Sequence, residues 1–257
     1  MKYSTMTQPE EHQQETVTVS PMERLMAHVL SHKIEMTILF TRLLTIMFTI
    51  LYFIPIFGNL YSSYNKALIA NAATSALRLH QRHPRITYSV DFFKAVLRED
   101  SCHYFAYSMI FLYVAPFTLA LLPVFLFALI QCASYSLILL DILGQNSWCG
   151  MRLLISFVEL QSSNILNLIA CVEIILLPFC IILILLGRAG LLTSIVYYRF
   201  LLMRCKSQRN ATTRNLFTYF LVSLANVANR PATSDFVRMI INFFIRFLSR
   251  LFPIAVQ

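Results

Sequence analysis

Charged side chains are scarce in this sequence of 257 residues. Asp, Glu, Lys and Arg together make up 13% of the chain, whereas hydrophobic residues make up 58%. An ordinary soluble domain has about 25% charged and roughly 45–50% apolar residues. A soluble protein needs that charge to cover its surface, and the mean hydropathy here is +0.65. The composition therefore argues against a water-soluble enzyme domain and indicates a membrane protein.

The sequence also lacks the short motifs that mark common enzyme classes. It has no HExxH, nucleophile-elbow or Walker pattern and no paired carboxylates. Its six cysteines form no CxxC pair and no zinc spacing, so we interpret them as small buried hydrophobic residues. We therefore expect no enzyme activity, no cofactor, no metal and no identifiable small-molecule substrate.

One group of side chains keeps a metal-dependent alternative open. His80 and His83 lie at i and i+3, and Cys102 and His103 follow further along the chain. Such a group could serve a lipid-modifying enzyme, and this is the third functional hypothesis. Solvated histidines at the end of a helix near a membrane interface explain the same residues.

Three apolar blocks predict an all-α, multi-pass membrane protein with interfacial amphipathic helices. The first is an uncharged run over about residues 43–64, which Pro55 and Gly58 should kink or end. The second, residues 104–140, would be about 55 Å long as one helix. We expect a break near Pro116 and Pro123, which gives either two short spans or a re-entrant hairpin. The third block covers residues 165–186.

The remaining segments are interpreted around these blocks. Residues 1–21 are predicted to be a disordered polar tail, and residues 22–198 a helical membrane domain. No signal peptide is evident in residues 1–35, so the first spanning segment should direct insertion. Further helices are predicted from Met22 to Arg42, over residues 67–84, and after Ser89 as N-cap. Residues 141–159 read as a polar connection, and residues 199–257 as a basic cytosolic segment.

The positive charge is concentrated in that last segment. Residues 199–257 carry nine Lys/Arg and a single acid, Asp235, which accounts for +8 of the net charge of +9. The positive-inside rule therefore places the C-terminus in the cytosol. A single crossing by residues 104–140 fits the distribution of Lys and Arg better than four full crossings, and membrane segments that all enter as cytosol-facing hairpins fit it better still. The Asn210 sequon lies in this block, so we expect it to be unmodified.

Residues 235–252 have the pattern of a helix that lies in the membrane surface. At 100° per residue, Asp235, the three arginines and their polar neighbours fall within an arc of about 120°, and five phenylalanines occupy the other side. Each Arg would cost roughly 2.5–3.5 kcal/mol at the bilayer centre, so an in-plane position is favoured over a spanning one. Packing on the protein's own membrane helices is the alternative. Nucleic-acid binding is not expected, because the basic residues are interleaved with Phe and Leu.

From these patterns we predict residues that contact anionic lipid headgroups. They are Arg204, Lys206, Arg209, Arg214, Arg238, Arg246 and Arg250, together with Phe243, Phe244 and Phe247.

Glu173 is an ionisable residue in the middle of the third apolar block. Such a group is costly in a bilayer and is by default a candidate functional residue. It could lie on the pathway of an ion channel or transporter subunit, which is the second functional hypothesis. A transport path generally needs several such groups, so we favour a structural role in which Glu173 holds two helices together.

Four strings resemble, in order, the signatures of the transmembrane protein 33 family, also called Krüppel homologue 2. These strings are ALIANAATSALRLHQRHP, LREDSCHYFAYSMIF, NILNLIACVEIILLP and YYRFLLMR. The similarity covers roughly residues 36–210, and the fungal pore-membrane nucleoporins are more distant relatives.

The resemblance implies a multi-spanning helical protein of the endoplasmic reticulum membrane and nuclear envelope. Proteins of this family associate with reticulon-type membrane-shaping proteins and with nuclear pores, and they influence the tubular network. The family implies no catalytic activity and no cofactor. Within its signatures, Glu173, Asp100, Cys102 and His103 read as structural positions. We therefore expect a non-enzymatic protein that organises membrane shape.

Overall fold

The computed structural model describes residues 20–54, 59–85, 89–144, 149–207, 211–231 and 233–252. Within these ranges the chain forms ten α-helices and no β-strand, which confirms the predicted all-α class. Pro55, Gly58, Arg209 and Asn210 lie outside the described residues, as does nearly all of the predicted tail. The helices are α1 Pro21–Ser31, α2 Lys33–Phe53, α3 Leu60–Arg82, α4 Val90–Leu97, α5 Asp100–Leu112, α6 Thr118–Ile142, α7 Cys149–Leu185, α8 Leu191–Lys206, α9 Ala211–Ala228 and α10 Asp235–Leu251.

Local capping explains where several helices begin. The Ser20 hydroxyl accepts a hydrogen bond from the Glu23 amide, and the Glu23 carboxylate accepts one from the Ser20 amide, which forms a capping box before α1. Ser89 caps α4 by accepting from the Phe92 amide at 3.1 Å, as the sequence predicted. Ser234 caps α10 in the same way through Val237. These side chains satisfy amides that would otherwise lack partners.

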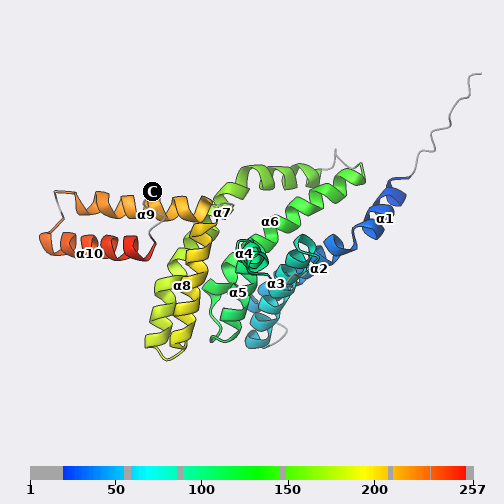
Figure 1. Cartoon of the computed structure of the whole chain (residues 1–257). Helices are drawn as coiled ribbons and strands as arrows, with labels where there is room; N and C mark the ends of the chain where they lie inside the picture. The colour runs from blue at the N-terminus through cyan, green and yellow to red at the C-terminus, as the bar shows by residue number, and fades with distance from the viewer. Residues whose placement is uncertain are drawn as a thin grey trace, which may run out of the picture.

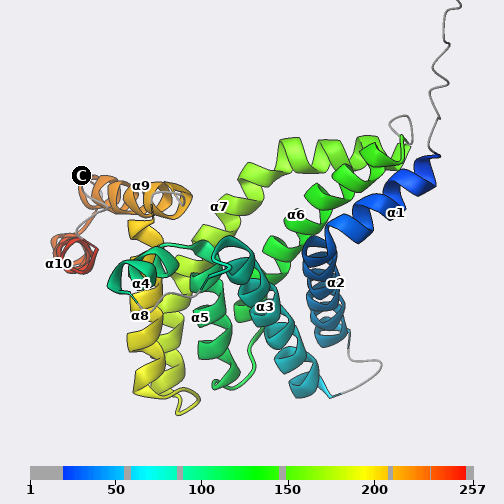
Figure 2. The ribbon, with the colours of Figure 1, turned by 45° about the vertical axis from the view of Figure 1, so that its right-hand side comes forward.

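Three pairs of consecutive helices, α2–α3, α5–α6 and α7–α8, form the body of the molecule. In each pair one helix, α2, α6 or α7, is long and apolar enough to cross a membrane. The ends at which the first helix of each pair stops and the second begins all lie on one side of the molecule, which we call the turn side (Figures 1 and 2). The other ends of the pairs lie together on the opposite side, the open side, near α1, α4 and α9 (Figure 2).

The first two apolar blocks are each divided between two helices, near the positions where the sequence predicted a kink, an end or a break. In the first block, α2 begins before the block, at Lys33, and ends at Phe53, and α3 begins at Leu60. Two charged residues in the N-terminal half of α2 contact other helices: Arg42 is buried, and Glu35 accepts hydrogen bonds from Gln81 and Tyr135. In the second block the helix stops between Leu112 and Thr118, around Pro116.

Pro123 does not break the second block. It lies inside α6, where its missing N–H removes one helical hydrogen bond without ending the helix.

The third block is longer than predicted. α7 runs for 37 residues and includes much of the predicted polar connection 141–159. At about 1.5 Å per residue it is longer than a ~30 Å hydrocarbon layer. Its N-terminal part runs beside α6 and its C-terminal part beside α8 (Figure 2).

An aromatic core joins α5 to α8. The rings of Tyr107 and Phe111 lie 4.6 Å apart, and Phe200 and Tyr197 of α8 pack on them at 5.4 and 5.5 Å. All four side chains are almost completely buried. The predicted boundary at residue 199 therefore falls inside a helix whose C-terminal half belongs to the core.

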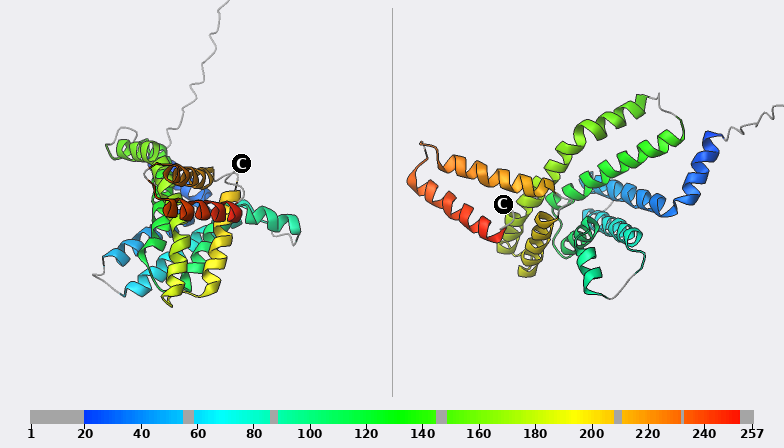
Figure 3. Two further views of the ribbon diagram at one scale, coloured as in Figure 1. Left: turned by 90° about the vertical axis from the view of Figure 1, so that its left-hand side faces the viewer. Right: turned by 45° about the horizontal axis from the view of Figure 1, so that its top comes forward.

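The last two helices form an antiparallel pair at one end of the molecule (Figures 1 and 3). α9 packs on α7 and α8, and α10 packs on α9. Phe252 follows α10 and is buried against Phe217 of α9, with ring centroids 4.7 Å apart. The pair is thus anchored at the end of α8 while most of α10 extends away from the membrane helices.

Candidate functional site

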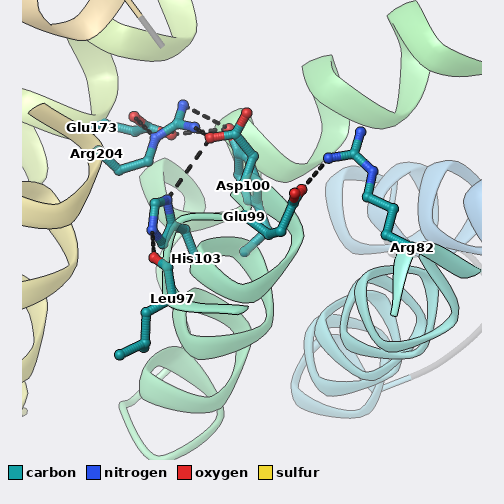
Figure 4. A network of polar contacts seen from close by, with 8 residues as sticks. Arg82, Leu97, Glu99, Asp100, His103, Glu173 and Arg204 are labelled. Carbon is teal, nitrogen blue, oxygen red and sulfur yellow. Dashed lines mark hydrogen bonds and ion pairs between the residues drawn. The ribbon is translucent and has the colours of Figure 1, made fainter. Parts of the chain in front are cut away.

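A buried ion pair lies at the centre of the molecule. Glu173 of α7 is fully buried, and Arg204 of α8 is 5% exposed. The guanidinium donates from Nε to Glu173 Oε2 and from Nη2 to Oε1, each at 3.1 Å. This bidentate geometry, seen in Figure 4, is the strongest form of Arg–carboxylate pairing.

The start of α5 completes this network. Asp100 Oδ1 accepts from Arg204 Nη1 at 3.4 Å. The Tyr104 hydroxyl donates to Glu173 Oε1 at 2.9 Å, and the Arg204 guanidinium lies 5.0 Å from the centre of the Tyr104 ring. Three helices distant in sequence are therefore joined through one guanidinium.

Two further side chains, His103 and Glu99, lie next to this network (Figure 4). His103 contacts the Leu97 carbonyl oxygen through Nε2 at 2.7 Å. Glu99 forms an ion pair with Arg82, which ties the end of α3 to the start of α5.

This arrangement fits the structural interpretation of Glu173. Both oxygens of its carboxylate are engaged by Arg204, and the second functional hypothesis would need them accessible to a moving ion. A buried, fully paired carboxylate instead fixes the relative positions of α5, α7 and α8.

The network also corrects the prediction for Arg204. The sequence placed it among the residues that contact headgroups, because it lies in a run of basic residues. The side chain points into the protein, where two carboxylates bind it. Position along the chain could not reveal this, because both acids are distant in sequence.

The exposed site is α10, where most of the other predicted surface residues lie. Phe243, Phe244 and Phe247 are 65%, 45% and 49% exposed. Arg246 and Arg250 are exposed beside them. The apolar face of α10 is thus left uncovered by the rest of the described chain, except near Leu248 and Phe252.

The other predicted surface residues have different environments. Arg238 is partly buried and holds the turn between α9 and α10, with Nε donating to the Ala228 carbonyl and Nη1 pairing with Asp235 at 3.0 Å. Lys206 is exposed and Arg214 partly so. Arg209 lies outside the described residues.

The possible metal ligands are not brought together. His103 is buried in α5, whereas His83 follows α3 and packs on Phe92 with ring centroids 5.8 Å apart. In the part of the chain that the structure describes, no group of three or more His, Cys, Asp or Glu residues could hold a metal ion.

Sequence reasoning missed Arg42 as a residue of interest. It marked only the start of the first uncharged block, but the structure buries it between helices, 6% exposed. The position of this arginine directly before a long apolar segment was the feature of the sequence that could have identified it.

Comparison with known proteins places the chain in a family. The family model described as transmembrane protein 33/nucleoporin POM33 matches residues 18–254. The chain belongs to this family. Krueppel homolog 2 of Drosophila melanogaster is 44% identical over 206 residues, which cover 79% of this chain and 75% of that protein. Transmembrane protein 33 of Homo sapiens is 41% identical over 202 residues, which cover 78% and 82%.

The homolog in Caenorhabditis elegans is 38% identical over 195 residues, which cover 73% of this chain and 72% of that protein. No solved structure matches the chain. The chain is thus a membrane protein of the transmembrane protein 33 family, which is not known as an enzyme family, and the resemblance found in the sequence is confirmed.

Proposed function

We propose that this protein is a non-enzymatic organiser of endoplasmic reticulum and nuclear-envelope membranes. It would act through reticulon-type partners and, at the nuclear envelope, through pore components, as the family resemblance implies. The observation that carries the proposal is the uncovered phenylalanine face of α10 beside exposed arginines. Such a helix binds the surface of an anionic leaflet and acts on its packing.

The energetics favour a lipid partner for this face. Burying a Phe side chain stabilises by about 1.5–3 kcal/mol, and Phe243, Phe244 and Phe247 all project from one helix. A basic residue near an anionic leaflet adds about 1 kcal/mol. Packing on the protein's own helices, the alternative considered from the sequence, accounts only for the side of α10 that faces α9.

The arrangement of the helix pairs supports a cytosolic open side. Basic residues lie at the open ends of the pairs, and α9 and α10 lie on that side as well (Figure 2). On the turn side, Arg188 lies between α7 and α8, and Lys66 lies in the second turn of α3. The positive-inside rule then favours the C-terminus in the cytosol, with all three pairs entering from that side.

The direct test compares the tagged full-length protein with two altered forms. One lacks residues 211–257, and the other carries Arg246→Glu and Arg250→Glu, which leave the structural Arg238 untouched. The unaltered protein should label reticular membrane and the nuclear rim, and both altered forms should label the nuclear rim less. Arg246→Lys with Arg250→Lys keeps the charge and should behave as the unaltered protein. Plasma-membrane labelling of the unaltered protein would refute the proposal.

A further inference from the structure

A polar cavity of about 170 Å³ lies between α2, α3, α6 and the start of α5. Three arginines line it: Arg42 from α2, and Arg78 and Arg82 from α3. Among the described residues of its wall, Asp100 is the one carboxylate, and Arg204 already binds it. The cavity is therefore rich in positive charge although it lies within the membrane helices.

Arg42 lacks a partner for part of its guanidinium. Its side chain is almost completely buried, and in the described part of the chain Nη2 has no hydrogen-bond partner. A buried charged donor is strongly destabilising unless an acceptor binds it. The unpaired nitrogen therefore indicates that an acceptor from outside the chain completes this site.

The other two arginines of the cavity, Arg78 and Arg82, also favour a bound anion. Arg78 donates to Gln131 Oε1 at 3.1 Å, but it forms no ion pair with any carboxylate that the structure describes. Arg82 pairs with Glu99 (Figure 4), lines the cavity and is exposed to solvent. Three guanidinium groups on one small cavity repel one another, and a bound anion removes that repulsion.

We propose that this cavity binds a phosphate group, supplied by the headgroup of an anionic phospholipid. Guanidinium groups bind phosphate oxygens in bidentate geometry, and basic pockets between membrane helices bind anionic headgroups. The cavity is smaller than the ~300–1,000 Å³ clefts that hold drug-sized ligands, so it fits a small group rather than a large one.

A lipid is favoured over a soluble phosphate because of what surrounds the cavity. Its walls come from α2 and α6, two of the candidate membrane spans. α2 also exposes Phe40 and Leu43, by 60% and 50%, on faces other than that of Arg42, so the outer surface of this cavity wall is apolar and can contact acyl chains. The site does not involve α10, so it stands or falls independently of the proposed membrane-surface function.

The test measures thermal unfolding of the purified full-length protein in a neutral detergent. Three probes are added separately at equal concentrations: dioctanoyl phosphatidic acid, dioctanoyl phosphatidylcholine and inorganic phosphate. Phosphatidic acid should raise the unfolding temperature, and the zwitterionic lipid should do so much less. Inorganic phosphate distinguishes the sources: a shift with a similar midpoint would show a soluble-phosphate site, and a much weaker effect would show a lipid site.

Two variants locate the effect in the cavity. Arg42→Gln with Arg78→Gln should weaken phosphatidic acid binding about tenfold or more, because hydrogen bonds from charged donors are lost. Without ligand this variant should fold, since it removes two cationic side chains that form no ion pair with a carboxylate among the described residues. Arg24→Gln with Arg152→Gln removes the same charge from exposed positions and should bind as the unaltered protein does. Ala128→Leu, which only fills space in the cavity, should also weaken binding.

The proposal is overturned by any of three results. The first is the absence of a shift with both phosphatidic acid and inorganic phosphate. The second is an equal shift with phosphatidylcholine, which would show that the negative charge is not recognised. The third is unchanged binding by both the double arginine variant and Ala128→Leu.

Discussion

At the scale of single residues, a buried ion pair organises the molecule. Glu173 and Arg204 are both almost completely buried, and Asp100 and Tyr104 complete the contacts of the guanidinium. A buried pair is a weak source of net stability, but removal of one partner leaves an uncompensated charge. The pair therefore specifies how α5, α7 and α8 fit together more than it strengthens the fold.

This leads to a double-mutant prediction. Glu173→Leu or Arg204→Met alone should lower the free energy of unfolding by about 3–5 kcal/mol. The two changes together should be clearly less harmful than their sum, although Asp100 then loses its partner. SDS-induced unfolding in mixed micelles measures all three variants. Strictly additive losses would show that the two side chains do not act as a pair.

The same residue discriminates between the functional hypotheses. If Glu173 were on an ion path, reconstituted protein should conduct, and Glu173→Gln should abolish the flux. From its pairing with Arg204 we expect no Glu173-dependent flux in liposomes.

At the scale of elements, α10 differs from every other helix described. Its polar residues share one arc, α9 covers one edge, and Phe243 and Phe247 stack on the open face with ring centroids 6.5 Å apart. Its pattern was visible in the sequence because the period of a helix alone determines which side chains share a face. The sequence could not show that the phenylalanine face of α10 stays uncovered, because this depends on how α10 packs against α9.

A fluorescence experiment tests what covers α10. Trp148 is the single tryptophan, so Trp148→Phe provides a dark background for a reporter. Phe243→Trp in that background should show blue-shifted emission in nanodiscs with anionic lipid, because the ring enters the acyl region. Asn242→Trp, one position away on the polar arc, should stay red-shifted in the same nanodiscs.

Salt gives the second arm of this experiment. High salt should weaken the blue shift of the Phe243→Trp protein, because screening reduces the attraction of Arg246 and Arg250 to the leaflet. An equal blue shift in purely zwitterionic nanodiscs would show that α10 inserts by hydrophobic burial alone. Electrostatic attraction to anionic lipid would then make no contribution.

At the scale of the whole molecule, the three helix pairs share one orientation. The ends at which the two helices of each pair meet lie on one side. On the other side lie α1, which carries Arg24, α4, which carries Lys94, and the C-terminal end of α8 at Lys206 (Figure 2). If α2, α6 and α7 crossed the membrane but α3, α5 and α8 did not return, Arg24 and Lys94 would face opposite compartments.

Cysteine labelling distinguishes these topologies. In a cysteine-free protein, Arg24→Cys, Lys94→Cys and Lys206→Cys should each react with a membrane-impermeant maleimide added to intact microsomes. Arg188→Cys, at the turn between α7 and α8, should react only after detergent is added. Protection of Lys94→Cys together with labelling of Arg24→Cys would contradict the hairpin arrangement.

Much of the architecture could be predicted from the sequence because it depends on local chemistry. Ser89 identified the start of α4, and Pro116 marked a break that the structure places between Leu112 and Thr118. Other boundaries were wrong where a charge or polar run looked incompatible with a membrane helix. α2 begins before Arg42, and α7 includes polar residues of the predicted connection. Both helices pack on other helices of the protein, and these contacts stabilise helical structure beyond the apolar runs.

The sequence by itself determined the class of protein: scarce charge and long apolar runs require a bilayer, and helical periodicity produces the amphipathic α10. Only the tertiary structure decided what the individual charges do. Arg204, predicted to meet lipid, binds Glu173, and Arg42, which looked like a flanking residue, lines a cavity without a partner for Nη2 among the described residues. The physical reason is that the free energy of a charge near a membrane depends on its nearest opposite charge. That partner comes from a distant part of the chain.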